Sequence, residues 1–277
     1  MPVGFVVTSA DATDVDNSAA MTAPIVFDRR LYAARRLRAE KAARQSFLVR
    51  HAAENLSERL AAAKQRFCRA LDLNSRPQSF EVLAGHADSW VSTGLHPHSR
   101  AVSLVADEEA LPFATHTFDL VVSVLGLHAV NDLPGALVQI RRALTPDGLF
   151  VAALFGGATL GELRRAFAAG ESERTGGASP RVAPFADVRD MGALLQRAGF
   201  ALPVADLDRV TVRYGSFVTL VDDLRAPGET NALAQRRRSL LSRGVLTAAL
   251  KNYEQIDSCD GKLTATFEVI YLTGWAS

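Results

Sequence analysis

The sequence lacks several features that would place it in a more specialised class of protein. Its two cysteines, Cys68 and Cys259, are too few for a disulfide framework, so we expect a reducing compartment. Its longest apolar run, Leu120 to Val130, is too short to span a bilayer and contains His128. The formal net charge is only +1, which gives no overall field favouring nucleic acid or an anionic membrane. With 48% hydrophobic residues in 277, the chain is typical of a soluble globular protein with one large domain, or one domain and a small addition.

The first twenty residues lack any arginine or lysine, although they contain Asp11, Asp14 and Asp16. A secretory signal needs a basic region and a transit peptide needs scattered arginines, so neither fits. We expect residues 1–25 to be disordered or to precede the native start, for which Met21 is a candidate. A functional tail is the alternative.

Proline and glycine are absent from Arg29 to Arg66, where alanine, arginine, leucine and glutamate dominate. This composition predicts a helical segment over residues 26–66, with two helices broken near Phe47–His51. Basic residues far outnumber the glutamates here. Such a surface is either a solvated helix face or a site for an acidic partner or nucleic acid.

From residue 67 onward, short apolar runs alternate with helical segments, which predicts a parallel sheet with right-handed crossovers. Runs rich in valine and leucine and bounded by turns predict strands buried on both faces. The predicted strands are Phe67–Leu73, Trp90–Leu95, Ala101–Val105, Phe118–Val124, Leu149–Phe155, Ala205–Tyr214 and Thr264–Trp275. The predicted helices include Phe80–His86, Pro134–Leu144, Asp190–Phe200, Phe217–Leu224 and Asn231–Tyr253, with a turn at Thr145–Gly148 and a polar loop at Glu171–Pro180. The chain thus reads as an α/β domain over residues 67–277 with a helical insert at about 215–255.

The turn after the first strand lacks the glycines that a nucleotide-binding α/β domain normally has there. The chain reads LDLNSRPQ from Leu71 to Gln78, and the first glycine after Asp72 is Gly85. Such glycines let the backbone approach a ligand and free N–H groups at the start of the next helix. Asn74 adopts a positive φ more readily than most residues, so we expect the turn to survive in a more crowded form.

Three further stretches should meet this turn, because ligands in such folds lie outside the carboxyl ends of the strands, where the strand order reverses. The second strand runs into GLHP, Gly94–Pro97, without the acid that normally binds a pair of ribose hydroxyls. After the third strand, Asp107 is placed to accept a hydrogen bond from an exocyclic amine such as that of adenine. The alternative is a carboxylate that stabilises the start of the next turn. The fourth strand leads into Ser123–His128, which contains Ser123, Leu125 and His128.

Two of these stretches carry a resemblance to a known family. ADEEALPF, Ala106–Phe113, and FDLVVSVLGLHAVNDLPGAL, Phe118–Leu137, are similar to motifs of class I S-adenosylmethionine-dependent methyltransferases. More narrowly, the chain resembles the mitochondrial complex I assembly factor 5 family and its bacterial relatives, cousins of the malonyl-carrier methyltransferases of biotin synthesis. The resemblance covers residues 26–275, and its other motifs are VFDRR (Val26–Arg30), FGGATLGELR (Phe155–Arg164), ERTGG (Glu173–Gly177), SPRVAPF (Ser179–Phe185), RAGF (Arg197–Phe200), DDL (Asp222–Leu224), GETN (Gly228–Asn231) and ATFEVIYLTGW (Ala265–Trp275).

The resemblance implies a Rossmann-like class I methyltransferase fold. That fold has a mostly parallel seven-stranded sheet, helices on both faces and an antiparallel last strand. It also implies S-adenosylmethionine as cofactor, bound by Asp72, Asn74, Asp107, Glu108, Ser123 and Leu125. The chain departs from the family at Leu71–Gln78, where L-D-L-G-x-G-x-G is usual and all three glycines are missing, and near Leu95, where an acid is usual. The adenine side of the pocket is therefore kept, while the methionine and ribose sides are altered and binding is weakened.

Three functions fit this resemblance. The leading one is methyl transfer to a protein acceptor, such as a complex I subunit, in complex I assembly. There the protein would mainly supply orientation and a closed pocket, and His128 is the candidate general base. The second is a non-catalytic assembly factor with a degenerate cofactor site, whose basic N-terminal helix and insert contact a complex I subunit. The third is peptidyl-arginine hydroxylation, which is described for the assembly-factor group and needs an oxidant and usually a metal.

No metal site is predicted, because the loop of His96 and His98 offers no obvious third ligand. Without a visible targeting segment, we expect a bacterial cytoplasmic location. The mitochondrial matrix is the alternative if residues 1–20 are not the native start.

Overall fold

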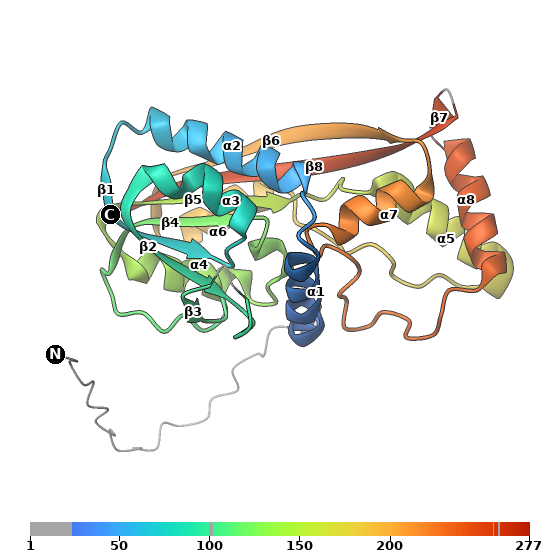
Figure 1. Ribbon diagram of the computed structural model, residues 1–277, viewed down its shortest axis with the longest axis horizontal. Coiled ribbons are helices and arrows are strands. Elements are labelled where there is room, and N and C mark those ends of the chain that lie inside the picture. Colours follow the sequence, from blue (N-terminus) through green and yellow to red (C-terminus); the bar gives the residue numbers. More distant parts are fainter. Residues whose placement is uncertain (1–23, 100–101, 257, 260) are drawn as a thin grey trace, which may run out of the picture.

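The computed structural model describes residues 24–99, 102–256, 258–259 and 261–277 (Figure 1). The expectation for residues 1–23 therefore falls outside the described part of the chain. Among the described residues, no helix combines the length and apolar character that a membrane crossing requires.

A single mixed sheet organises the chain, with strand order β3-β2-β1-β4-β5-β8-β6 and the short β7 paired to β8. Strands β1 to β5 are mutually parallel, and β8 runs antiparallel between β5 and β6. This arrangement confirms the predicted fold, including the antiparallel last strand. The strand bounds are β1 Phe67–Leu73, β2 Ala87–Gly94, β3 Leu104–Val105, β4 Phe118–Val124, β5 Leu144–Phe155, β6 Phe200–Tyr214, β7 Ser258–Cys259 and β8 Lys262–Ala276.

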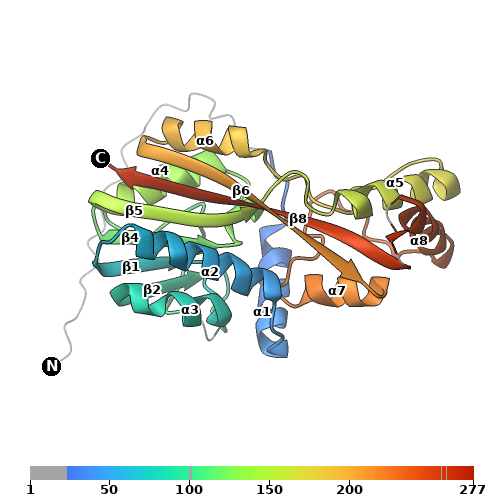
Figure 2. The ribbon, with the colours of Figure 1, turned by 90° about the horizontal axis from the view of Figure 1, so that it is seen from above.

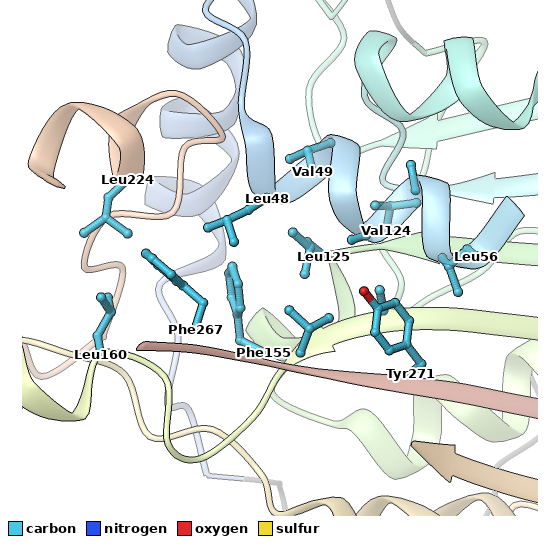
Figure 3. Close-up of a cluster of buried hydrophobic side chains, with 14 of the residues drawn as sticks. Leu48, Val49, Leu56, Val124, Leu125, Phe155, Leu160, Leu224, Phe267 and Tyr271 are labelled. Atoms are coloured by element: carbon cyan, nitrogen blue, oxygen red, sulfur yellow. The ribbon is translucent and has the colours of Figure 1, made fainter. Parts of the chain in front are cut away.

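Helices cover both faces of this sheet. On one face, α2 (Phe47–Ala62) and α3 (Pro77–Leu83) lie over the parallel strands, and α2 buries Leu48, Val49 and Leu56 against Val124 and Phe155 (Figure 3). On the other face, α4 (Leu133–Ala143) and α6 (Val188–Arg197) pack against β4, β5 and β8 through a second apolar cluster. The near-continuous apolar sequence of β4 follows from this, because both of its faces are buried.

Strands β6 and β8 extend beyond the rest of the sheet, and three helices pack around their far ends (Figure 2). These helices are α5 (Gly161–Thr175), α7 (Phe217–Arg225) and α8 (Arg243–Ile256). Helices α5 and α8 approach closely at Gly170, where an added Cβ would lie 2.5 Å from the Ala249 nitrogen. Any larger residue at position 170 would therefore push the two helices apart.

Three local predictions about elements are wrong. The helix expected from Asn231 begins only at Arg243, because Leu233 instead forms a bridge with Phe27. The polar loop expected from Glu171 is helical as far as Thr175. The turn expected at Thr145–Gly148 lies inside β5, where Asp147 has a positive φ of 60°.

Helix α1 (Arg29–Ala42) lies across the carboxyl edge of the parallel strands (Figure 1). Asp28 caps its first turn by accepting from the Leu31 nitrogen, and the chain leaves it through Ala43 with a positive φ of 49°. The predicted break between the first two helices thus falls at residues 43–46, before Phe47. Because α1 lies directly over the strand ends, the N-terminal segment forms part of the candidate site.

Candidate functional site

The turn after β1 keeps its tight geometry without glycine. Asn74 takes the left-handed conformation, with φ 55°, as expected for an asparagine that replaces a glycine. The Ser75 nitrogen donates to the Thr93 oxygen over 2.8 Å, which holds the turn against β2. Pro77 then starts α3, where a missing N–H is tolerated.

Arg76, which stands at the middle glycine position of the family motif, points into the crevice between β1 and β4. Its side chain donates to the Leu125 oxygen over 2.5 Å, to the Pro227 oxygen over 3.1 Å and to a Glu229 carboxylate oxygen over 2.6 Å. Arg76 is only 7% exposed. The crevice is the point where the strand order reverses, so this guanidinium occupies the place where ligands of the fold usually lie.

Glu229, from the GETN motif between α7 and α8, is the counter-ion at the centre of the site. Besides Arg76, its carboxylate contacts His128 Nε2 at 2.9 Å and accepts from the Tyr32 hydroxyl over 3.2 Å. Burial alone would raise the pKa of Glu229, but the charges of His128, Arg76 and Arg36 outweigh it and lower the pKa to about 2. Burial and the same carboxylate raise the pKa of Tyr32 to about 12. Glu229 therefore stays ionised and closes the crevice as half of a buried ion pair.

Asp107 and Glu108, the predicted adenine-side residues, are both bound by Arg29 of α1. The Arg29 side chain donates to Asp107 over 2.8 Å, pairs with Glu108, and donates to the Ala129 oxygen over 2.9 Å. Burial lowers the pKa of Arg29, but the two carboxylates raise it more, so the net shift is upward. Asp107 also accepts from the Glu109 nitrogen over 3.0 Å, as in the alternative role of stabilising the next turn.

Asp72, Asn74 and Ser123 lie at the carboxyl ends of β1 and β4, and several of their polar atoms have no hydrogen-bond partner within the described residues. These atoms are Asp72 Oδ1, Asn74 Nδ2 and Ser123 Oγ. Asp72 is 1% exposed, and burial raises its pKa to about 7, although the Ser75 hydroxyl, Arg36 and Arg76 lower it. Leu125 takes part through its backbone, because its oxygen accepts from Arg76.

His128, the candidate general base, lies in η2 (Leu127–Ala129) against the rings of Phe155 and Phe185. Its Nε2 faces Glu229, while its Nδ1 has no partner within the described residues. A histidine oriented by a carboxylate is the usual arrangement of a catalytic base. Here the same carboxylate also pairs with Arg76, so the histidine is held inside the closed cluster.

A cavity of about 200 Å³ lies beside this cluster, on the side of α1 and β2. We call it the α1 cavity. Its walls include Arg36, Glu40 and Ser46 together with the stretches 74–78, 94–96 and 226–227. His96 and His98 lie near its mouth with ring centroids 5.3 Å apart. Within the described residues, no group of three His, Cys, Asp or Glu side chains is arranged to hold a metal ion.

The residues predicted from the sequence lie at one edge of the sheet in the structure, but the charged groups beside them were not predicted. Arg76 was treated only as a lost glycine, Glu229 only as part of a family motif, and Arg29 as one of many basic residues. An arginine at a buried glycine position was the available signal, since a buried guanidinium needs a carboxylate partner.

Comparison with known proteins agrees with this architecture. A family model described as "Methyltransferase domain" matches residues 60–152. The solved structure of the YcgJ protein from Bacillus subtilis superimposes with a TM-score of 0.54 at 13% identity, covering 81% of this chain and 98% of that one. A putative methyltransferase from Bacillus halodurans gives 0.53 at 14% identity, covering 79% and 98%. The chain has the fold of the class I S-adenosylmethionine-dependent methyltransferases.

Within that class, the chain resembles the proteins named arginine-hydroxylase NDUFAF5, mitochondrial. It is 49% identical to the human protein over 175 residues, which are 63% of this chain and 50% of that one. It is 46% identical to the mouse protein over 190 residues, 68% and 55% respectively. A malonyl-[acyl-carrier protein] O-methyltransferase from Gallionella capsiferriformans is 39% identical over 176 residues, 64% and 58%. The chain spans about half the length of the curated relatives it matches.

The match to a methyltransferase domain implies the S-adenosylmethionine cofactor of this fold, but features of the structure oppose its entry between β1 and β4. The crevice that would receive it holds the Arg76 guanidinium and the Glu229 carboxylate. The carboxylates on the adenine side are already neutralised by Arg29. A sulfonium ligand would also bring a second positive charge beside a buried arginine, which low polarity makes costly.

Proposed function

We propose that this protein is a methyltransferase-fold assembly factor for respiratory complex I that binds a protein partner without transferring a methyl group. The buried Arg76–Glu229 ion pair in the crevice between β1 and β4 carries this proposal. Removing one member of such a pair leaves an uncompensated buried charge, at a cost of about 3–5 kcal/mol. A ligand that must displace Arg76 from Glu229 would lose a comparable part of its binding energy.

The resemblance to the complex I assembly factor 5 family supports a role in assembly, and the charge of the surface around α1 supports a protein partner. Arg236 donates to Asp28 over 3.1 Å, and burial together with the charges of Arg236 and Arg38 lowers the pKa of Arg35. A surface with such crowded positive charge favours an acidic protein segment. This role is compatible with a bacterial cytoplasmic site of action and with a mitochondrial one, the location that the names of the relatives give.

A second candidate is an enzyme, either a methyltransferase or an arginine hydroxylase. The His128–Glu229 pair and the unpartnered polar atoms of Asp72 and Ser123 favour it, because catalytic sites often hold such groups. For either reaction, Arg76 would have to leave the crevice first.

Calorimetric titration of S-adenosylmethionine into the purified protein tests the proposal. We expect no binding heat up to millimolar ligand for the wild type. The double variant Arg76→Gly/Glu229→Gln, which empties the crevice without leaving a lone charge, should gain measurable affinity. Micromolar binding by the wild type that disappears in Asp107→Ala would instead establish a working cofactor site, and the enzyme candidate would replace this proposal.

The assembly role has its own test in a strain that lacks the gene. The amount of complete complex I on a native gel should fall, and the protein carrying Asp107→Ala should restore it as the wild type does. If the wild type restored complex I and Asp107→Ala did not, although both proteins were equally abundant, the role would need cofactor chemistry. That result would contradict the proposal. Unchanged complex I in the deletion strain would contradict the assembly role itself.

A further inference from the structure

Four arginines from two distant segments gather beside α1, and we call them the cationic cluster. Arg35 and Arg38 lie on α1, and Arg236 and Arg238 lie in the segment between α7 and α8 (Figure 1). Burial, followed by the charges of Arg236 and Arg38, lowers the pKa of Arg35. A backbone hydrogen bond and the charges of Arg236 and Arg238 lower the pKa of Asp28, the cap of α1. The four guanidinium groups therefore act on one small area of the surface.

Backbone and side-chain hydrogen bonds hold the two segments of the cluster against each other. The Ala234 nitrogen donates to the Val26 oxygen over 2.8 Å, just before α1. The Arg35 side chain donates to the Asn231 oxygen. A surface that is already fixed in this way loses little conformational freedom when a ligand binds, which favours affinity.

The cluster has more positive charge than its own carboxylates neutralise. Asp28 pairs with Arg236 at 3.1 Å. Among the described residues, no carboxylate lies within ion-pair distance of the other three arginines of the cluster. Arg38 and Arg238 are exposed, and the neighbouring Arg237 is exposed as well. Because the whole chain has a net charge of only +1, this excess of positive charge is local.

Two exposed apolar side chains come from the same two segments. Leu240, two residues after Arg238, is 96% exposed, the largest fraction among the large apolar side chains of the described residues. Ile25, which precedes the residue that pairs with Ala234, is 73% exposed. A ligand with apolar groups between its negative charges would remove both side chains from water.

We propose that the cationic cluster binds an acidic segment of a partner protein, with carboxylates on the arginines and apolar side chains against Leu240 and Ile25. Planar guanidinium groups match the geometry of carboxylates, and complementary charge selects the partner. The inference rests on the proposed function, because it names the chemistry of the protein partner proposed there.

The exposure of the arginines favours a protein segment over a membrane surface or a nucleic acid. Arg236 has only 18% of its side chain exposed, and Arg35 is partly buried. A flat bilayer would reach only the protruding arginines, whereas single carboxylates on a flexible segment can reach all four. A nucleic acid is an extended polyanion, and its affinity depends on many phosphate contacts, which a local excess of charge does not supply.

Fluorescence anisotropy with the full chain tests the inference. The probe is a fluorescein-labelled peptide of repeated Glu-Asp-Leu units, and its control is a peptide of repeated Gln-Asn-Leu units. We expect the wild type to bind the acidic peptide and not the neutral one, and added salt should weaken the binding. The double variant Arg38→Gln/Arg238→Gln should bind the acidic peptide about tenfold more weakly. The matched control, Arg189→Gln/Arg197→Gln, removes two exposed arginines of α6 and should bind as the wild type does.

The apolar part of the inference has its own pair of variants. Leu240→Ser should weaken the binding of the acidic peptide by about threefold or more. Leu202→Ser removes another exposed leucine, 76% exposed at the start of β6, and should leave the binding unchanged.

Several results would overturn the inference. These are equal binding of the acidic and neutral peptides, an equal loss in the cluster variant and the α6 control, and binding to phosphatidylglycerol vesicles without binding to the peptide. A tenfold gain in peptide affinity in Asp11→Asn/Asp14→Asn/Asp16→Asn would assign the cluster to the acidic N-terminal segment of this chain instead of a partner.

The outcome for S-adenosylmethionine separates this inference from the proposed function. If neither the acidic peptide nor S-adenosylmethionine binds, only the inference fails. If both bind, the inference is supported and the proposed function fails.

Discussion

Two regions lie next to each other on the same strands: the apolar faces of the sheet and the carboxyl edge beneath α1. On the faces, Leu56, Val124 and Phe155 pack as ordinary buried hydrocarbon (Figure 3). At the edge, the backbone of Asn74 and Leu125 is left-handed and buried charges are paired across long stretches of sequence. Most of the buried polar atoms without partners in the described residues also lie here or along α1.

The difference shows where this chain departs from a generic α/β domain. An apolar face needs only residues of the right size in the right period, and it contributes stability through burial. The edge instead uses charged groups, and their contribution to the stability of the protein depends on every partner being present. Unsatisfied buried polar groups that gather at one edge are typical of a functional site.

The largest effect should come from breaking the ion pair in the crevice. Glu229→Ala leaves Arg76 buried and charged, so we expect a loss of about 3–5 kcal/mol in the free energy of unfolding measured with urea. Asp206→Ala, which removes a 61% exposed partner of Arg59, should cost about 1 kcal/mol or less. Similar losses for the two variants would mean that the crevice pair is solvated.

Leu56→Ala tests the apolar face for comparison. Leu56 is fully buried between α2 and the sheet, and its truncation should cost about 2–4 kcal/mol in the same urea measurement. Because this loss comes from removed hydrocarbon, it should hardly change between low and high salt or between pH 5 and pH 7.5. A strong dependence on pH would show that α2 is coupled to the charged edge.

The same contrast between the apolar faces and the charged edge explains how much of each region the sequence predicts. The bounds of β1 and β4 were predicted correctly, because apolar runs between turns are a local signal. The helix expected from Asn231 was wrong, since composition favours a helix there while the bridge to Phe27 holds the chain extended. At the edge, the positions of Asp72 and Asn74 at the end of β1 follow from the predicted bounds of that strand.

The partners of these residues could not be found in the same way. Arg76 and Glu229 are 153 residues apart, and Arg29 and Asp107 are 78 apart. No periodicity links such positions, and the contact exists only because α1 and the segment before α8 lie over the same strand ends. The missing glycines predict an altered site, but they do not predict the charged pair at this edge.

The pH dependence of stability provides a third test, centred on Asp72. Burial raises its pKa to about 7 in the folded protein, above the value of about 3.9 for an unfolded chain. The folded state therefore binds more protons between these values, and stability should fall as pH rises from about 4 to 7, by at most about 1.4 kcal/mol per pH unit. Glu229 acts oppositely, because its lowered pKa contributes stability that is lost as pH falls from about 4.5 to 2.

Urea unfolding at pH 5 and pH 7 measures this dependence. Between these two pH values, the free energy of unfolding should change less for Asp72→Asn than for the wild type. An equal change in both proteins would mean that Asp72 is ionised throughout.

The smallest effect should come from the contact that seats α1 on the edge. Gly228, in the GETN motif, has a φ of +83°, and an added Cβ would lie 3.1 Å from the backbone of Arg36. Gly228→Ala should therefore cost about 1–2 kcal/mol, from the left-handed backbone and from pressure on α1. Gly215→Ala is the matched control, since no atom lies within 4 Å of its added Cβ. Urea unfolding should therefore show the loss for Gly228→Ala and a smaller loss for Gly215→Ala. Equal losses for the two variants would mean that neither the left-handed backbone of Gly228 nor its close approach to α1 restricts the residue at this position.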